Sequence, residues 1–302
     1  MENYYYLIKL LFSEGYTVIR FYKSYVCYEP RRNMVMDYNR AIEMVKRNPI
    51  IIKTIKNPTE EMKLLAVEKD GMSLQYIKDP TEEMNIKALK SNINAIEFIY
   101  EPTLEMKEYA VKESWNTLKY IDAPSEELVS LGIEQKGWAI QYIKNPSCHL
   151  QRLAIEKNYD SIKYIENPCE EVQLAAVNIS YDALRYINNP SEKAEISAIR
   201  NNEAAIKFVH NLDKEKMIKF LKENILVIKY LIKDISIEEL EGVLKERLSS
   251  EDIEESYVRN FINCESINKK YNNISMDKII FIHKYGSSRA KRVAIDEKLK
   301  IM

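Results

Sequence analysis

The chain has 302 residues, of which 46% are apolar, and its 45 basic and 46 acidic residues give a net charge of −1. This balance excludes an overall electrostatic field that would recruit nucleic acid or an anionic membrane. Only six residues are glycine, which argues against the tight turns of a β-sandwich and against the glycine-rich loops that hold nucleotides.

The cellular location follows from three features of the sequence. The sequence contains no run of 18 apolar residues, so it predicts no transmembrane helix. The segment from Met1 to Phe12 is short and lacks the small-residue cleavage site of a secretory signal. Four cysteines without paired short spacings are typical of a reduced protein. We therefore expect a cytoplasmic protein.

The first 36 residues are rich in tyrosine and form the first predicted region. Tyr4, Tyr5 and Tyr6 lie near the start, and Arg31 and Arg32 lie near the end. We expect a capping helix and another short element that cover the open face of the region that follows. Because tyrosine and arginine dominate binding hot spots, the alternative is that these five residues dock a partner.

A repeat of 22 residues organises the second region, residues 37–233. Seven of the nine prolines stand 22 residues apart without a single insertion. Repeats of this length indicate stacked supersecondary units, each of which depends on its neighbours for a core. The prolines are Pro58, Pro80, Pro102, Pro124, Pro146, Pro168 and Pro190.

Each unit opens with signals for a helix of about ten residues, with positions counted from the proline. Position 1 is mostly serine or threonine, which caps a helix N-terminus. Glutamates at positions 2 and 3 complement the helix dipole. Position 8 is alanine or glycine in all seven units, so we expect the first helix to approach a neighbouring helix closely at that point.

A second helix of about seven residues is expected after a two-residue break. Positions 16 and 19 are branched and apolar, and position 18 is always tyrosine or phenylalanine. At about 100° per residue, positions 15, 16, 18 and 19 form one stripe and position 17 points away from it. We expect the rings to pack in the core. The alternative is an exposed aromatic column for a peptide or for stacked bases.

Diverged helices are expected in the third region, residues 234–302. Ser236 opens a lengthened helix pair that ends near Asn263. Ser287 is placed to cap a last helix that runs through Lys300. Such atypical terminal units keep a repeat array soluble, because they present a polar outer face.

The repeated pattern resembles the α-solenoid class, which includes HEAT and tetratricopeptide repeats, and is similar to short two-helix repeats of phage, giant-virus and bacterial proteins. The resemblance rests on Asn-Pro-[Ser/Thr]-Glu-Glu, an Ala-Val pair and a closing [Tyr/Phe]-Ile, over about residues 37–233. It implies an all-α, right-handed α-solenoid of about eight or nine repeats that binds other macromolecules. The 22-residue period departs from those of the named families, so no residue-level function carries over.

No motif for catalysis or cofactor binding is found. The sequence lacks G-x-G-x-x-G, the phosphate-binding G-x-x-x-x-G-K-[ST] and H-E-x-x-H. Cys148, His149 and Cys169 are the nearest approach to a zinc set, but adjacent helices stack roughly 8–10 Å apart whereas ligands lie within about 2.3 Å of zinc. We expect no catalytic residue, no metal and no cofactor.

Position 17 carries the most informative charge pattern, because five of the six units from Lys119 onward have a basic residue there. One interpretation is a solvated face with carboxylates nearby, such as Asp160 and Asp182. The other is a positive track of roughly 50 Å that binds an acidic protein surface or nucleic acid. The candidate partner-binding residues on this track are Lys119, Lys163, Arg185, Lys207 and Lys229.

The sequence favours a non-catalytic, macromolecule-binding solenoid, either a protein-interaction scaffold or an inhibitor. We expect a protein partner, no membrane and no small-molecule substrate. The alternative is nucleic-acid or nucleoprotein binding through position 17, and a third class is an enzyme with its site in residues 234–302. Enrichment in Lys, Ile, Asn, Tyr and Glu is typical of AT-rich bacterial or viral genomes, and a phage-encoded inhibitor of a host defence complex fits this style.

Overall fold

A computed structural model of the chain describes residues 16–18, 28–30, 38–268 and 274–300. Near the N-terminus, strands β1 (Tyr16–Val18) and β2 (Tyr28–Pro30) pair in antiparallel fashion, with Thr17 opposite Glu29. Of the helix and short element expected in residues 1–36, the described residues show this strand pair alone. Tyr4, Tyr5, Tyr6, Arg31 and Arg32 lie outside the described residues.

The described chain from Tyr38 to Leu231 is an all-α repeat solenoid in which an α-helix alternates with a short second helix. The α-helices have ten residues each and begin 22 residues apart, as the proline spacing predicts. Nine such pairs follow one another in this span: α2 (Tyr38–Arg47) and η1 (Pro49–Thr54), α3 (Glu60–Lys69) and η2 (Gly71–Tyr76), α4 (Glu82–Ser91) and η3 (Ile93–Phe98), α5 (Leu104–Glu113) and η4 (Trp115–Tyr120), α6 (Glu126–Gln135) and η5 (Gly137–Tyr142), α7 (Cys148–Lys157) and η6 (Tyr159–Tyr164), α8 (Glu170–Ile179) and η7 (Tyr181–Tyr186), α9 (Glu192–Asn201) and η8 (Glu203–Phe208), and α10 (Lys214–Glu223) with η9 (Ile225–Val227), which continues into α11 (Ile228–Leu231).

The second helices from η1 to η9 are 3₁₀-helices, so the expectation of α-helical geometry there is corrected. In η2, for example, the N–H of Ile77 donates to the carbonyl of Leu74 at 3.0 Å, which is an i→i+3 bond. At about 120° per residue, positions 16 and 19 share one face, and Leu74 and Ile77 are buried there. Position 18 instead shares a face with position 15, which is a small buried residue such as Ser73.

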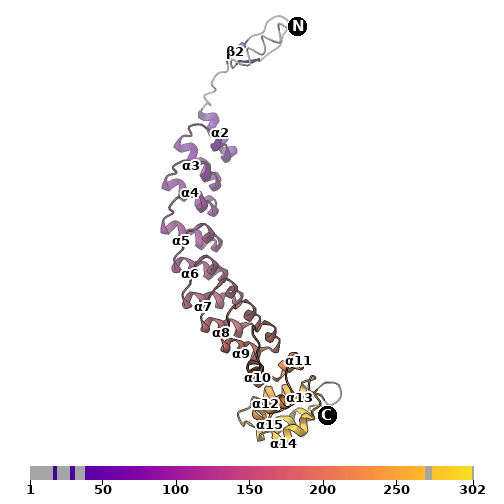
Figure 1. Cartoon of the computed structure of the whole chain (residues 1–302). Coiled ribbons are helices and arrows are strands. Elements are labelled where there is room, and N and C mark those ends of the chain that lie inside the picture. Colours follow the sequence, from indigo (N-terminus) through magenta and orange to yellow (C-terminus); the bar gives the residue numbers. More distant parts are fainter. Residues whose placement is uncertain (1–15, 19–27, 31–37, 269–273, 301–302) are drawn as a thin grey trace, which may run out of the picture. The chain divides into compact units, whose positions relative to one another are not determined.

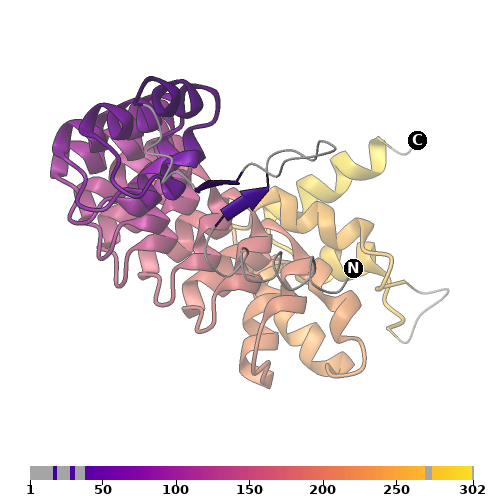
Figure 2. The same ribbon diagram turned by 90° about the horizontal axis from the view of Figure 1, so that it is seen from above.

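Contacts divide the chain into two compact units, residues 1–110 and 111–302. Within the first unit, α3 packs against α4, and α4 also packs against η2 of the preceding repeat. Within the second unit, α7, α8, α9 and α10 pack side by side in chain order (Figures 1 and 2). In both units the α-helices therefore pack against the helices of neighbouring repeats.

Small residues at position 8 allow this close packing, as the sequence predicts. Ala154 and Ala176 have no exposed surface. At Gly132, a Cβ atom would lie 2.7 Å from Cδ1 of Leu118 and 3.0 Å from Cβ of Ala139. The helix and its neighbours therefore leave no room for a larger side chain at these positions.

In the described part of the second unit, four α-helices follow the repeats: α12 (Ile237–Ser249), α13 (Glu255–Asn263), α14 (Lys278–Tyr285) and α15 (Ser288–Leu299). Ser236 and Glu239 form a reciprocal capping box at the start of α12. The Ser287 hydroxyl accepts the N–H of Ala290 at 3.2 Å and so caps α15, as predicted. In the parts of the chain that the structure describes, no helix is both long and apolar enough to span a membrane.

Candidate interaction surface

The cations at position 17 lie on the exposed side of the second helices in the unit 111–302. All five are exposed, and they come from η4, η6, η7, η8 and α11. The prediction that position 17 points away from the core is confirmed, whereas partner binding there stays a prediction. We call the set the basic column: Lys119, Lys163, Arg185, Lys207 and Lys229.

Aromatic rings at position 18 accompany the basic column. Nζ of Lys119 lies 4.4 Å from the ring centroid of Tyr120, and Nζ of Lys207 lies 5.4 Å from the ring of Tyr230 in the next repeat. Both distances allow cation–π attraction. The same contact within one repeat recurs as Lys163 over Tyr164, Arg185 over Tyr186 and Lys229 over Tyr230.

The rings at position 18 do not pack in the core, so that expectation is corrected. Tyr164 keeps 37% of its surface exposed, and Tyr186 and Tyr230 are half-buried. In the 3₁₀ geometry position 18 lies about 120° from positions 16 and 19, so its ring is not directed into the buried face that those two positions share. The rings therefore form an accessible aromatic edge beside the basic column.

Trp138 of η5 connects two neighbouring repeats at the centre of this surface. Its indole N–H donates to Oδ1 of Asp160 at 2.9 Å. Nζ of Lys163 lies 4.3 Å from the Trp138 ring centroid and 3.0 Å from Oδ2 of Asp160. Nζ of Lys136 lies 4.5 Å from the same ring, and the Tyr164 ring meets it edge-on at 6.1 Å. These contacts hold the Lys163 ammonium in one place on the surface.

Lys163 and Lys229 of the basic column each pair with a carboxylate of a second helix. The hydrogen bond to Asp160 raises the pKa of Lys163. Burial raises the pKa of Asp160, but hydrogen bonds from Trp138 and Lys163 outweigh it, and the net pKa lies below the ordinary value. Nζ of Lys229 lies 2.5 Å from Oε1 of Glu203, and this hydrogen bond raises the pKa of Lys229. The column is therefore a surface of mixed charge with a positive excess.

A pocket of about 430 Å³ opens between the loops that precede α7 and α8. Tyr164 lines it together with Asn145 and Asn167, which stand before the prolines of the two repeats. Lys144 and the buried Gln151 complete much of the wall. The pocket places a concave site with both polar and apolar walls next to the aromatic edge.

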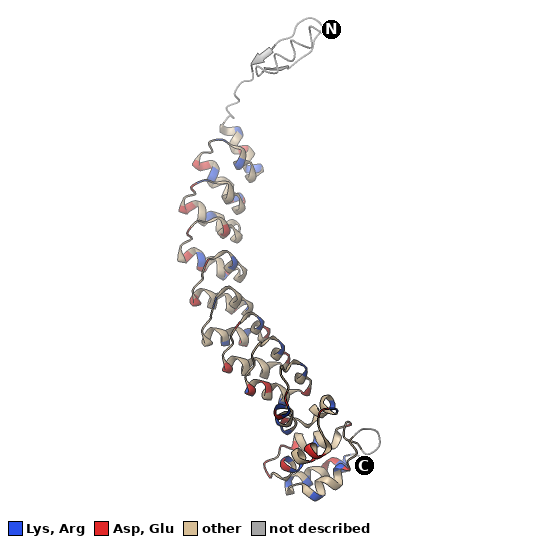
Figure 3. Cartoon of the chain, in the orientation of Figure 1, with Lys and Arg blue, Asp and Glu red and all other residues tan. Residues whose placement is uncertain are grey.

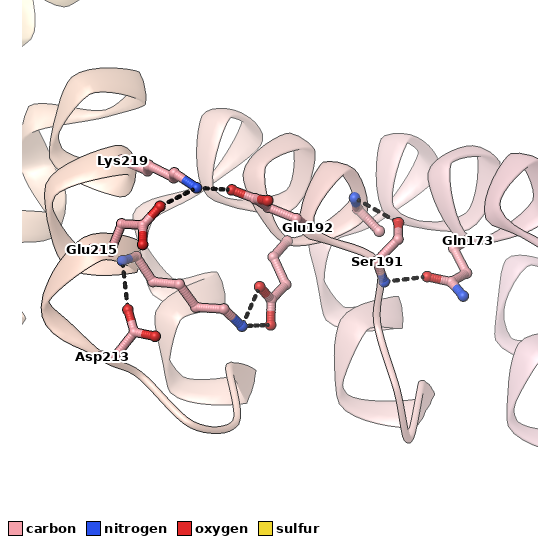
Figure 4. Close-up of polar contacts among 9 residues, drawn as sticks. Gln173, Ser191, Glu192, Asp213, Glu215 and Lys219 are labelled. Carbon is pink, nitrogen blue, oxygen red and sulfur yellow. Dashed lines mark hydrogen bonds and ion pairs between the residues drawn. The ribbon is translucent and has the colours of Figure 1, made fainter.

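The first turns of the α-helices carry charges that are paired between repeats. Figure 3 shows both signs interspersed along the ribbon, and Figure 4 shows Lys219 between two carboxylates. Nζ of Lys219 lies 2.5 Å from Glu192 of the preceding repeat and 2.9 Å from Glu215 of its own, and the hydrogen bond to Glu192 is the main cause of its raised pKa. The Lys219–Glu192 pair therefore bridges two repeats. Further pairs between repeats are Arg152 with Glu171, Lys193 with Glu170 and Lys222 with Glu246.

Buried glutamines join successive repeats behind these ion pairs. Oε1 of Gln173 accepts the N–H of Ser191 at 2.7 Å (Figure 4). Its Nε2 donates to the carbonyl of Pro168 at 2.9 Å. Gln151 makes the same bonds one repeat earlier, where Oε1 accepts the N–H of Cys169 at 3.1 Å. Each glutamine satisfies a backbone donor at the start of the next helix. The repeats beneath the basic column are thereby held in register.

Cys148 and Cys169 are joined by a disulfide, with Cα atoms 6.1 Å apart. The expectation that the cysteines are reduced is therefore wrong for this pair. A spacing of roughly 8–10 Å applies to helix axes, whereas Cys148 is the first residue of α7 and Cys169 directly precedes α8, so their side chains meet between the two helix starts. Within the described residues, no three His, Cys, Asp or Glu side chains are grouped to hold a metal ion.

No protein-family model matches the chain, and no curated protein or solved structure matches it either. The repeat architecture therefore stands on the packing of successive helix pairs, without assignment to HEAT, tetratricopeptide or another family. The sequence patterns did not point to Trp138 or to the buried glutamines, and they named Asp160 only as a carboxylate near position 17, not as the partner of Trp138. The signal for Trp138 was available, because Trp115 and Trp138 both stand at the start of a second helix in successive repeats.

Proposed function

We propose that this chain is a non-catalytic binding protein that engages a protein partner through the basic column and its aromatic edge. The observation that carries the proposal is the recurrence of an exposed cation against an adjacent, partly exposed ring in four repeats of one unit. Tyrosine, tryptophan and arginine are the residues that dominate binding hot spots. The pocket beside Tyr164 supplies a place for one anchoring side chain of the partner.

The carboxylates within the column favour a protein partner over a nucleic acid. Asp160 and Glu203 each pair with a cation of the column, and Asp182 lies near Arg185. A polyphosphate backbone would meet these three negative charges along its path. A protein surface that carries charges of both signs is more complementary to such a pattern.

The test compares two triple variants that remove the same charge from different places. The column variant is Lys163→Gln, Arg185→Gln and Lys207→Gln. The control is Lys157→Gln, Lys291→Gln and Arg292→Gln, at exposed positions of α7 and α15. Glutamine is chosen over glutamate because a second carboxylate beside Asp160 would disturb the Trp138 cluster.

A partner is first isolated with the wild-type chain and identified by mass spectrometry, and its affinity for each variant is then measured by calorimetry. We expect the column variant to bind the purified partner about tenfold more weakly, because several ion pairs of modest strength are lost. The control variant should bind like the wild type. Equal affinity of the column variant and the wild type would contradict the proposal.

Nucleic-acid binding is the second candidate, and one observation favours it: cations beside rings at regular intervals are the elements of a stacking surface for single strands. The probe is a single-stranded oligonucleotide of about 20 nucleotides. Binding through the column would weaken steeply with salt, because released counterions return to the phosphates. Binding of the oligonucleotide with that slope, together with nuclease-sensitive capture, would replace the first proposal.

Within the proposed function, the chain acts as a scaffold or as an inhibitor, for instance a phage-encoded inhibitor of a host defence complex. The two roles differ in their effect on the partner. An inhibitor lowers the activity of the purified partner in proportion to the complex formed, whereas a scaffold leaves it unchanged and brings a third component into the complex.

A further inference from the structure

Two departures from the repeat pattern meet at one interface between repeats. Position 1 is serine or threonine in six of the seven proline-led units, and Cys169 is the exception. Position 2 is glutamate in five of the seven, and Cys148 is one of the two exceptions. The two cysteines belong to successive repeats, and their side chains form a disulfide.

The preceding interface shows what these two positions do elsewhere. There, Glu126 at position 2 faces Ser147 at position 1 of the next repeat. Oε1 of Glu126 accepts the Ser147 N–H at 2.6 Å, and Oε2 accepts its hydroxyl at 2.6 Å. Position 2 of one repeat and position 1 of the next are thus contact positions. A covalent bond between Cys148 and Cys169 takes the place of that polar contact.

The cysteine at position 1 weakens the helix start in return. The hydroxyls of Ser147 and Ser191 accept backbone N–H groups at 3.3 and 3.2 Å and so cap α7 and α9. The Cys169 side chain makes no such bond at the start of α8. The repeat therefore gives up a capping interaction at the one position 1 that carries a thiol.

The pair is also accessible, unlike the third cysteine that the structure describes. Cys148 is exposed and Cys169 is half-buried. Cys264 is only 3% exposed, and burial raises the pKa of its thiol, so it is a poor competitor for exchange. Oxidants and reductants in solution therefore reach the Cys148–Cys169 pair first among these residues.

We propose that Cys148 and Cys169 form a reversible, redox-responsive staple between two neighbouring repeats. The oxidant is a low-molecular-weight disulfide such as oxidised glutathione. The Cys148 thiolate attacks one of its sulfurs and displaces one glutathione thiolate, which leaves a mixed disulfide. The Cys169 thiolate then attacks Sγ of Cys148 and displaces the second. Two protein thiols become one protein disulfide, and one glutathione disulfide becomes two thiols.

The staple acts on the local opening of the array. Repeat proteins are held together by interfaces between neighbours, and they open where an interface is weakest. The bond closes a segment with a sequence separation of 21 residues and restricts the freedom of the opened chain. In the oxidised chain the disulfide therefore holds α7 against α8. In the reduced chain only noncovalent contacts, including those of Gln151, stabilise that interface.

The test uses the full chain in buffers that contain different ratios of reduced to oxidised glutathione. Peptide mapping by mass spectrometry quantifies the bond between Cys148 and Cys169. Hydrogen exchange follows the amides of α7 and α8, and calorimetry gives the melting temperature. We expect the oxidised chain to melt higher by roughly 5 °C, and the exchange of α7 and α8 amides to slow by about tenfold.

A matched control comes from the neighbouring interface. The double variant Cys148→Glu, Cys169→Ser recreates the Glu126–Ser147 contact, so it should fold and lose all response to the glutathione ratio. Cys27, the fourth cysteine of the sequence, lies outside the described residues, and the Cys27→Ser variant should keep the wild-type response. The proposal is overturned if both thiols stay free in excess oxidised glutathione, if oxidised and reduced chains exchange alike, or if the response is lost with Cys27.

Discussion

The indole N–H of Trp138 donates a 2.9 Å hydrogen bond to the carboxylate of Asp160, which stands 22 residues further along the chain in the next repeat. The same carboxylate binds Lys163 at 3.0 Å, so one acidic group fixes both an aromatic and a cationic member of the exposed surface. The interface between repeats and the candidate interaction surface are therefore built from the same side chains.

A dependence of stability on pH follows from this contact. The pKa of Asp160 is lower in the folded chain than its ordinary value of about 4. The ionised Asp160 therefore stabilises the fold above about pH 4, and this stabilisation is lost as the pH falls through the lower pKa of the folded chain. When the pH is lowered from about 6 to about 2.5, we expect the urea midpoint of Asp160→Asn to fall less than that of the wild type.

Trp138→Phe is the matched variant for this prediction, since it keeps a ring and removes the donor. It should weaken the same acid-dependent contribution while the cation–π contacts of Lys163 persist. If the acid dependence of both variants equals that of the wild type, the Asp160 contact does not contribute to folding.

Gln173 provides a second test of how repeats are joined. Its buried amide binds the Ser191 N–H and the Pro168 carbonyl. Gln173→Ala leaves both backbone groups without this partner, so we expect a loss of about 1–3 kcal/mol in the free energy of unfolding by urea titration. Asn188→Ala, at an exposed position shortly before Ser191 in the sequence, should change stability by less than about 0.5 kcal/mol. Equal effects of the two substitutions would show that the bridge contributes nothing.

The helix starts could be predicted from the sequence because each depends on a few adjacent residues. Thr59 caps α3 and Ser236 caps α12 through local bonds, and the proline spacing fixes where such starts recur. The 3₁₀ geometry of the second helices could not be predicted. Over six residues, steps of 100° and 120° place positions 16 and 19 on nearly the same face, so the apolar pattern fits both.

Contacts between repeats could not be predicted from the sequence for a different reason. Trp138 meets Asp160, and Glu126 meets Ser147, across a separation of about one repeat. A reading along one repeat does not show such pairs. Glu126 and Ser147 stand at position 2 of one repeat and position 1 of the next, whereas Trp138 and Asp160 both stand at position 14, and only the packing of the helices brings these positions together. The basic column could be predicted from the sequence, because position 17 points away from the core in an α-helix and in a 3₁₀-helix alike.

Ala123 carries a testable backbone strain. It precedes Pro124 with φ of 44°, in the left-handed region, and Asn145 has φ of 51° at the same position one repeat later. Asparagine tolerates this region better than alanine. We expect Ala123→Asn to raise the free energy of unfolding by about 0.5–1 kcal/mol and Asn145→Ala to lower it by a similar amount. Thermal unfolding of both variants checks the opposite signs, and a shift in the same direction for both would refute the explanation.

A substitution of Ala154 tests the close packing between neighbouring repeats. It has no exposed surface, and its carbonyl oxygen would lie 2.4 Å from a Cβ placed on Gly137, so the end of α7 rests directly on the start of η5. Ala154→Leu adds three carbons to a side chain that has no exposed surface. We expect the free energy of unfolding, measured by urea titration, to fall by about 1–3 kcal/mol, because neighbouring side chains must leave their preferred rotamers. Lys157→Leu adds an apolar side chain of the same size on the exposed part of α7 and should stay within about 0.5 kcal/mol of the wild type. A matching urea midpoint for Ala154→Leu and Lys157→Leu would mean that the interface has spare volume at position 8, and the restriction of that position to alanine and glycine would then need a cause other than packing.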